Sequence, residues 1–221
     1  MTTQKICLVL GAGPGVGMAT GRRFAQAGYS IVLAARRIGA IQPLADNLTA
    51  EGFKASAVQV DCSDESNIRA VVAACGSVAV LLYNAAGVTM QVPSAITATK
   101  FNKDLFVSVT GALVASQAVT ESMSTDTPET LLFTGGGFAM RPMAALMSLG
   151  VGKAGLRNLV FSLGEEFRSK GIRVGTVTIM GTVSPGSAFD PAAIAEAFFQ
   201  LHMDRDYKLG LEISFTGQNK S

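Results

Sequence analysis

The sequence is poor in charged residues, and the charges it has are not concentrated in any one segment. Asp, Glu, Lys and Arg make up 15% of its 221 residues, and the formal net charge is only +2. A protein that binds the phosphate backbone of a nucleic acid needs a dense basic stripe, which is missing here. We therefore expect no nucleic-acid partner.

Long apolar runs are also missing, although apolar residues make up 48% of the sequence. No run approaches the ~18 residues that a transmembrane helix needs. The N-terminus passes through Lys5 directly into a short apolar stretch, without the basic and apolar regions of a signal peptide. The sequence predicts a cytoplasmic protein that does not enter the membrane.

Cysteine and histidine are scarce and scattered, which excludes a metal site of the usual kind. Cys7, Cys62 and Cys75 lie in or beside apolar runs without the spacing of metal ligands. We interpret them as small buried hydrophobes in a reducing compartment. The single histidine, His202 in FFQLHMDRD, is interpreted as a packing or helix-surface residue and not as a catalytic base.

Apolar runs rich in Val, Ile and Leu alternate with longer segments of helical spacing. Strands are predicted within residues 5–13, 29–37, 53–61, 77–87, 130–137, 171–181 and 211–217. Helices are predicted near residues 15–28, 40–51, 65–75, 98–123, 143–170 and 190–203. The alternation indicates an α/β fold with one doubly wound parallel sheet of about seven strands and helices on both faces. Length and the lack of a linker predict one domain over residues 1–221.

Two irregular stretches interrupt this alternation. Residues 124–129 are polar and contain a proline, which predicts a surface turn. The segment from Met180 to Asp190 combines small and turn residues after the carboxyl end of a strand, where open sheets place ligand contacts. For this second segment, a ligand-binding loop and a plain surface loop both remain open.

The stretch GAGPGVG, from Gly11 to Gly17, follows the first predicted strand and opens a helix. Such a turn aims backbone amides and the positive end of the helix at a phosphate group. Glycines at positions 11, 15 and 17 give the spacing G-x-x-x-G-x-G, with Val16 breaking the alternative G-x-G-x-x-G. The motif predicts a nucleotide site, and a tight turn without a ligand is the alternative.

The glycine spacing resembles that of the short-chain dehydrogenase/reductase family, and further motifs follow in the family's order. Arg36 follows the second strand in VLAARR, Asp61 ends the third in QVDCSD, NAAG (84–87) ends the fourth, and Lys153 lies in GVGKAGLRNL. The resemblance spans nearly the whole chain. It implies a Rossmann-type domain that binds NAD or NADP across the carboxyl edge of the sheet.

The resemblance also implies a role for each matching residue. Asp61 would contact the adenine and Asn84 the adenosine region of the cofactor. Lys153 would contact the nicotinamide ribose, and Val183 the carboxamide through its backbone.

The end of the second strand favours NADP over NAD. An NAD-selective site places a carboxylate there for the ribose 2′-hydroxyl, whereas this chain offers Ala35, Arg36 and Arg37. A guanidinium suits a 2′-phosphate, and each charge-assisted contact contributes about 1.5–3 kcal/mol. We therefore predict NADP, held by Arg36, and interpret Arg37 as a solvated residue that opens the next helix.

The catalytic positions of the family are largely replaced. In the family a tyrosine four residues before the lysine donates a proton, a serine thirteen residues before the tyrosine polarises the substrate carbonyl, and an asparagine supports a proton relay. These positions hold Leu149, Gly136 and Ser108 here. Enoyl-reductase relatives place the tyrosine seven residues before the lysine, where this chain has Leu146. Of the catalytic set only Lys153 is kept.

Lys153 has a use without a tyrosine, because an ammonium that reaches the ribose hydroxyls supplies binding. We expect Gly150 and Gly152 to leave space around it, and a lysine that extends along the helix to solvent is the alternative. The proline and threonine of the family's usual loop are replaced by Met180 and Pro185. The run MRPMAALM (140–147) is interpreted as a core or subunit contact.

Three functions follow from these observations. An NADP-dependent oxidoreductase that acts on an unidentified small molecule, with another source for the proton, comes first. A catalytically silent NADP-binding sensor or assembly protein is the alternative. An S-adenosylmethionine-dependent methyltransferase, suggested by LVLGAGPGVG, is less favoured because Arg36 stands where an acid would meet the ribose of that ligand. The resemblance and the long apolar segments 98–123 and 143–170 imply a homodimer or homotetramer.

Overall fold

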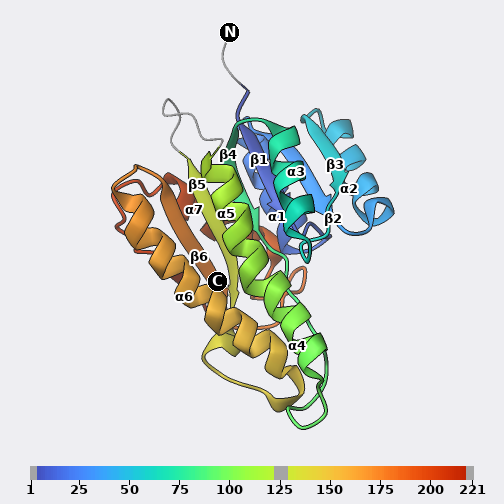
Figure 1. The fold of residues 1–221 in the computed structure, drawn as a ribbon. Coiled ribbons are helices and arrows are strands. Elements are labelled where there is room, and N and C mark those ends of the chain that lie inside the picture. Colours follow the sequence, from blue (N-terminus) through green and yellow to red (C-terminus); the bar gives the residue numbers. More distant parts are fainter. Residues whose placement is uncertain (1–3, 122–128, 218–221) are drawn as a thin grey trace.

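A sheet of seven parallel strands runs through the molecule in the order β3-β2-β1-β4-β5-β6-β7 (Figure 1). The computed structural model describes residues 4–121 and 129–217. The strands are β1 (Ile6–Leu10), β2 (Ser30–Ala35), β3 (Ala55–Gln59), β4 (Val78–Tyr83), β5 (Thr130–Gly136), β6 (Arg173–Ile179) and β7 (Glu212–Phe215). The chain winds outward from β1 to β3 and then crosses back to β4, so the strand order reverses between β1 and β4. Ligands of open sheets bind beside such a reversal.

Helices connect successive strands and cover both faces of the sheet. The α-helices are α1 (Val16–Gln26), α2 (Ile38–Ala50), α3 (Glu65–Cys75), α4 (Ala98–Leu105), α5 (Gly111–Glu121), α6 (Met147–Arg168) and α7 (Pro191–Met203). A π-helical turn, η1 (Phe106–Thr110), joins α4 to α5, and two short 3₁₀ turns, η2 (Gly137–Ala139) and η3 (Ala144–Leu146), precede α6. The predicted fold class is therefore confirmed.

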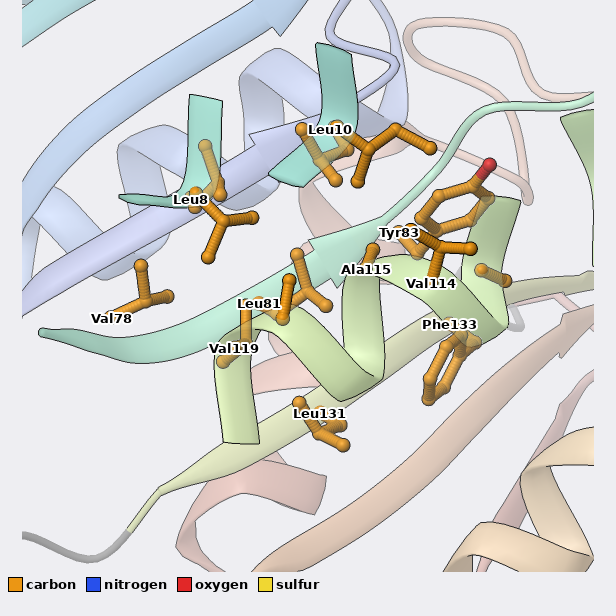
Figure 2. Close-up of a cluster of buried hydrophobic side chains, with 14 of the residues drawn as sticks. Leu8, Leu10, Val78, Leu81, Tyr83, Val114, Ala115, Val119, Leu131 and Phe133 are labelled. Carbon is orange, nitrogen blue, oxygen red and sulfur yellow. The ribbon is translucent and has the colours of Figure 1, made fainter. Parts of the chain in front are cut away.

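Two apolar cores, one on each face, hold the helices to the sheet. Alternate residues of a strand point to opposite faces, so Leu8 and Leu10 pack in one core while Cys7 and Val9 pack in the other. Figure 2 shows the first core, where residues of β1, β4 and β5 meet Val114, Ala115 and Val119 of α5. The second core packs the other face against α1, α2 and α7.

Side chains that accept hydrogen bonds fix the starts of three helices. Asp64 accepts a hydrogen bond from the backbone of Asn67 at the start of α3, and Thr97 accepts one from Lys100 at the start of α4. Asp190 does the same for Ala192 of α7, whose first residue is a proline. No side chain caps α1, which begins after Gly15.

The structure corrects two details of the sequence predictions and leaves a third untested. The segment 98–123 is not one regular helix, because the π-helical turn at 106–110 interrupts it. Met140 and Met143 are 46% and 51% exposed, so the interpretation of their run as core was wrong for these two residues. The predicted surface turn at 124–129 lies mostly outside the described residues, which resume at position 129.

His202 is a buried structural residue, as the sequence suggested. Its Nδ1 lies 2.8 Å from the Thr130 hydroxyl and 3.3 Å from Arg205 Nη2, and its Nε2 lies 2.9 Å from the Tyr29 hydroxyl. A guanidinium only donates hydrogen bonds, so Nδ1 accepts and the proton of the neutral ring sits on Nε2. Burial, with the nearby positive charges of Arg205 and Lys5, lowers the pKa of His202 to about 4.

We predict that this histidine makes the fold acid-sensitive. Its folded pKa of about 4 lies below the ordinary value of 6.5, so its contribution is complete above pH 6.5 and is lost as the pH falls toward 4. Between pH 7.5 and pH 5.0 the free energy of unfolding should fall by about 2 kcal/mol through this residue. Urea unfolding at the two pH values measures the loss. A His202→Gln variant should show a correspondingly smaller loss, and an equal loss in both proteins would contradict the assignment.

Candidate active site

Gly11 turns the chain sharply at the carboxyl end of β1. Its φ of +82° belongs to the left-handed region, and a Cβ on it would lie 2.4 Å from the backbone nitrogen of Ala85. The amides of Gly11 and Ala12 both donate to the carbonyl of Ala34, at 2.9 and 3.0 Å. Position 11 is therefore restricted to glycine by its conformation and by the segment that leaves β4.

The other glycines of the turn divide into two kinds. A Cβ on Gly13 or Gly15 would meet no atom within 4 Å, so open space lies beside both residues. A Cβ on Gly17 would lie 3.2 Å from Ala12 Cα and 3.4 Å from Val9, so this glycine lets α1 pack on β1. The turn thus combines a fixed backbone, an uncapped helix start and free space, which suits a phosphate group.

A pocket of about 260 Å³ lies beside the glycine turn. Arg36 and Arg37, both exposed, line it from the end of β2, and Asp61 lines it from the end of β3. Arg37 also precedes the first residue of α2, as predicted. Hydrogen bonds from the Ser63 amide and hydroxyl, at 2.9 and 2.8 Å, lower the pKa of Asp61, and the positive charge of Arg36 contributes.

Asn84 links the glycine turn to the centre of the sheet. Its Nδ2 donates to the carbonyl of Gly11 at 2.8 Å, and its Oδ1 accepts from the Thr134 hydroxyl at 2.8 Å. Asn84 also lines the pocket beside the turn. Sequence reasoning assigned this residue to the cofactor and missed its structural role, because the partner Thr134 lies fifty residues further along the chain.

Lys153 lies on α6 and points into the protein. Its side chain is buried, and Nζ donates to the carbonyl of Thr134 at 2.6 Å. Burial lowers the pKa of Lys153 to about 8. The alternative of a lysine that extends to solvent is therefore wrong.

A larger cavity of about 590 Å³ opens in front of Lys153. The side chains around it are mostly apolar, and its residues come from the carboxyl ends of β5 and β6, from the segments that follow these strands, and from α6. Its lining consists of Thr134, Gly135, Gly136, Gly137, Phe138, Arg141, Pro142, Met143, Lys153, Ile179, Met180, Gly181, Thr182 and Val183. The first four residues of the segment 180–190 therefore line a cavity, Val183 among them. The predicted contact of Val183 with a carboxamide stays a prediction.

The cavity contains few groups that could move a proton. Among the described residues, no tyrosine, serine, histidine or carboxylate lines it, and the charged side chains that do are Arg141 and Lys153. Leu149 is partly buried on α6 and is not among the lining residues. Tyr83 donates its hydroxyl to the carbonyl of Val107, so it serves the core.

Gly136 and Ser108, which stand at the expected serine and asparagine positions, lie in different surroundings. Gly136 has an extended backbone with φ −161°, and a Cβ there would meet nothing closer than Lys153 Cγ at 3.6 Å. Ser108 is buried in η1, and its Oγ accepts a hydrogen bond from the Gly87 amide at 3.0 Å. A Cβ on Gly152 would lie 2.7 Å from Ser108 Cβ. The structure therefore corrects our expectation for Gly152, which makes room for Ser108 and not for the lysine.

Two features of the described parts of the chain concern metal sites and membrane-spanning helices. Residues 4–121 and 129–217 contain no group of three His, Cys, Asp or Glu side chains that could hold a metal ion. Among the helices of these residues, none is long and apolar enough to cross a membrane.

Comparison with known proteins places these features in a family. The short chain dehydrogenase family matches residues 5–189. Cis-4-hydroxycyclohexanecarboxylate dehydrogenase of Sinomonas cyclohexanicum is 26% identical over 193 residues, which cover 85% of this chain and 75% of that protein. (+)-Borneol dehydrogenase 1 of Salvia officinalis is 28% identical over 194 residues, with coverages of 84% and 73%.

Solved structures agree with the sequence matches. A metagenomic short-chain oxidoreductase in complex with NADP superposes with a TM-score of 0.86, is 25% identical, and is matched over 98% of both chains. A short-chain dehydrogenase from Rhodopseudomonas palustris has a TM-score of 0.84 at 23% identity, over 95% of this chain and 96% of that one. The fold, the glycine turn and the sequence match lead to one conclusion, which is that this chain belongs to the short chain dehydrogenase family of oxidoreductases.

Proposed function

We propose that the protein is an NADP-dependent oxidoreductase that interconverts a carbonyl compound and an alcohol, with Lys153 as its catalytic residue. One observation carries the proposal. The pocket beside the glycine turn and the cavity in front of Lys153 are joined by a chain of hydrogen bonds through Gly11, Asn84 and Thr134 to Lys153. A ligand with a nucleotide end and a reactive end fits two such sites.

The residues around the two sites suit a dinucleotide. The open space beside Gly13 and Gly15 leaves room for a pyrophosphate at the start of α1, which no side chain caps. The residues that would hold the cofactor are Gly11, Gly15, Gly17, Arg36, Asp61, Asn84, Lys153 and Val183. When bound, the reduced cofactor supplies a hydride at its nicotinamide ring.

The preference for NADP rests on the end of β2. Arg36 and Arg37 are exposed there and line the pocket. The end of β2 itself carries no carboxylate in the sequence, and the Asp61 carboxylate lines the pocket from the segment after β3. A 2′-phosphate would accept hydrogen bonds from a guanidinium, whereas NAD offers only a hydroxyl. The complex of the metagenomic relative with NADP is consistent with this choice.

We predict that NADPH binds more tightly than NADH. Arg36→Ala should remove most of that preference, a loss of about tenfold or more, because one charge-assisted contact contributes about 1.5–3 kcal/mol. Titration calorimetry with both cofactors measures it. Arg22→Ala is the matched control, since Arg22 is bound to Glu51 on the surface. Equal affinities of the unmodified protein for the two cofactors would show that the positive charge of Arg36 does not select NADP.

The reaction centre lacks the hydroxyl that the family's usual mechanism requires. Leu149 occupies the tyrosine position and Gly136 the serine position, and no tyrosine or serine lines the cavity. A positioned tyrosine acid contributes ~10²–10⁴ in rate, so carbonyl reduction should be slower here than with that hydroxyl in place. The same observation favours the second candidate function, a silent NADP-binding sensor or assembly protein. Binding with no turnover at any pH would decide for the sensor.

We predict that Leu149→Tyr combined with Gly136→Ser raises the reduction of simple ketones and aldehydes by about 10²–10⁴. Serine fits at position 136, because its backbone is extended and a Cβ has space. Lys153 lies one helical turn after position 149, where its positive charge would lower the pKa of the new tyrosine. Steady-state oxidation of NADPH measures the rate.

The matched control carries Leu149→Phe with Gly136→Ser, which adds the same ring without the hydroxyl. We expect this variant to stay as slow as the unmodified protein. Similar rates for the tyrosine and phenylalanine variants would show that the missing hydroxyl is not what limits the reaction. Fast reduction by the unmodified protein would show that an efficient acid is already present.

The methyltransferase alternative has the least support. It leaves the buried Lys153 without a purpose, and the end of β2 carries Arg36 in place of the acid that the ligand's ribose would need. The match of the chain to the short chain dehydrogenase family does not support a methyltransferase either.

We also propose that the protein assembles into a homodimer or homotetramer. Val151 and Phe161 on α6 are 43% and 39% exposed, which leaves large apolar side chains on the outer face of this helix. Light scattering should give a mass of two or four chains, and Phe161→Glu should lower it. A monomer at micromolar concentration, in the unmodified protein, would contradict the assembly.

A further inference from the structure

The cavity in front of Lys153 raises the question of where the proton for a reduced carbonyl comes from. This question rests on the proposed function, because only a reduction that forms an alcohol needs such a proton. Four of the side chains that line the cavity carry N–H or O–H groups, and these are Thr134, Arg141, Lys153 and Thr182.

Three of these four side chains are poor sources of a proton. Arg141 is exposed, and a guanidinium does not lose its proton in proteins. The Thr134 hydroxyl donates to Asn84 Oδ1 at 2.8 Å, so its hydrogen is already in use inside the protein. Thr182 is an exposed aliphatic alcohol without a base beside it in the lining of the cavity. Elimination leaves Lys153.

The geometry of Lys153 suits the role. An ammonium has three N–H donors, and the structure gives Nζ one acceptor, the carbonyl of Thr134 at 2.6 Å. The side chain is buried at the cavity, and Leu149 stands one helical turn before it on α6 without a polar group to compete for the proton. Two N–H groups are therefore available to a ligand.

Burial keeps the proton on Lys153 labile. The lowered pKa of about 8 has burial as its cause, with no contribution from a charged neighbour. Arg141 is the other charged side chain that lines the cavity. The elements packed against α6 carry Lys100, Lys103 and Asp104 on α4 and Arg173 on β6, and the next charged residue on α6 itself is Arg157. A lysine that is mostly protonated at neutral pH and releases its proton near pH 8 is matched to acid catalysis.

We propose that Lys153 is the general acid of this protein and delivers its Nζ proton to the oxygen of the substrate carbonyl. The carbonyl carbon accepts a hydride from the reduced nicotinamide, which becomes the oxidised cofactor. The oxygen takes the proton from Nζ, so the C=O bond becomes an alcohol. The neutral amine then regains a proton from water.

Two measurements without turnover establish the starting point. NADPH binding to the unmodified protein, Lys153→Arg and Lys153→Met is measured by nucleotide fluorescence. The titration of Lys153 is followed by NMR on protein with ¹⁵N-labelled lysine, with Lys153→Arg identifying the signal. We expect a midpoint near pH 8 in the free protein, below the ordinary value of about 10.4 for exposed lysines.

The decisive measurement is the pH profile of a single turnover, with saturating NADPH and 4-nitrobenzaldehyde as the probe. The rate should follow the protonated fraction of Lys153, with a midpoint equal to the one that NMR gives for the same NADPH complex. For a midpoint at pH 8 the rate falls about thirtyfold between pH 7 and pH 9.5. Lys153→Arg keeps the positive charge for the cofactor but cannot release a proton. It should therefore still bind NADPH, but its rate should be at least tenfold lower and should no longer follow this pH profile.

Lys54→Met is the matched control, because this exposed lysine, which directly precedes β3, lies outside both cavities. Its rate and its pH profile should equal those of the unmodified protein. NADPH binding together with a flat profile, or with full activity in Lys153→Arg, would overturn the role of Lys153. Failure of the unmodified protein to bind NADPH, or the absence of turnover at every pH, would instead overturn the proposed function.

Discussion

The hydrogen bond from Lys153 to the carbonyl of Thr134 is the interaction on which both ends of the site depend. An ammonium in a protein interior is costly unless a polar partner receives it, and this carbonyl lies at the end of β5. The hydroxyl of the same threonine binds Asn84, and Asn84 binds the carbonyl of Gly11. Three neighbouring strands, β1, β4 and β5, therefore have their carboxyl ends fixed relative to the lysine.

Two groups of glycines serve opposite purposes around this chain of bonds. Gly11, Gly87 and Gly152 allow distant segments to touch, since a Cβ on each would lie within 2.8 Å of a neighbouring atom. Gly15 and Gly136 instead border open space, where a Cβ would meet nothing or make ordinary contacts. The first group lets the strands, helices and loops around the site pack closely, and the second leaves room where a ligand and a reacting group would lie.

The strands, the sheet and the glycine turn could be predicted from the sequence, because each is indicated by residues that are close together in the chain. Buried strands of a parallel sheet are continuous apolar runs, and the turn after β1 has its own glycine spacing. The π-helical turn at 106–110, the Thr134 partner of Lys153 and the contact of Gly152 with Ser108 could not be predicted. Each depends on which distant segments pack together, and the spacing of residues in the sequence does not contain that information.

The separation between the pocket beside the glycine turn and the cavity in front of Lys153 means that a change at one need not disturb the other. The pocket is built from strand ends, backbone and the side chains Arg36 and Asp61, and neither position 149 nor position 136 lines it. The residues at these two positions therefore leave that pocket intact. Of the two, only Gly136 lines the cavity, and the buried Lys153 lines it as well. In the proposed function, most of the residues that bind the nucleotide take no part in proton transfer, and Lys153 is the residue that belongs to both.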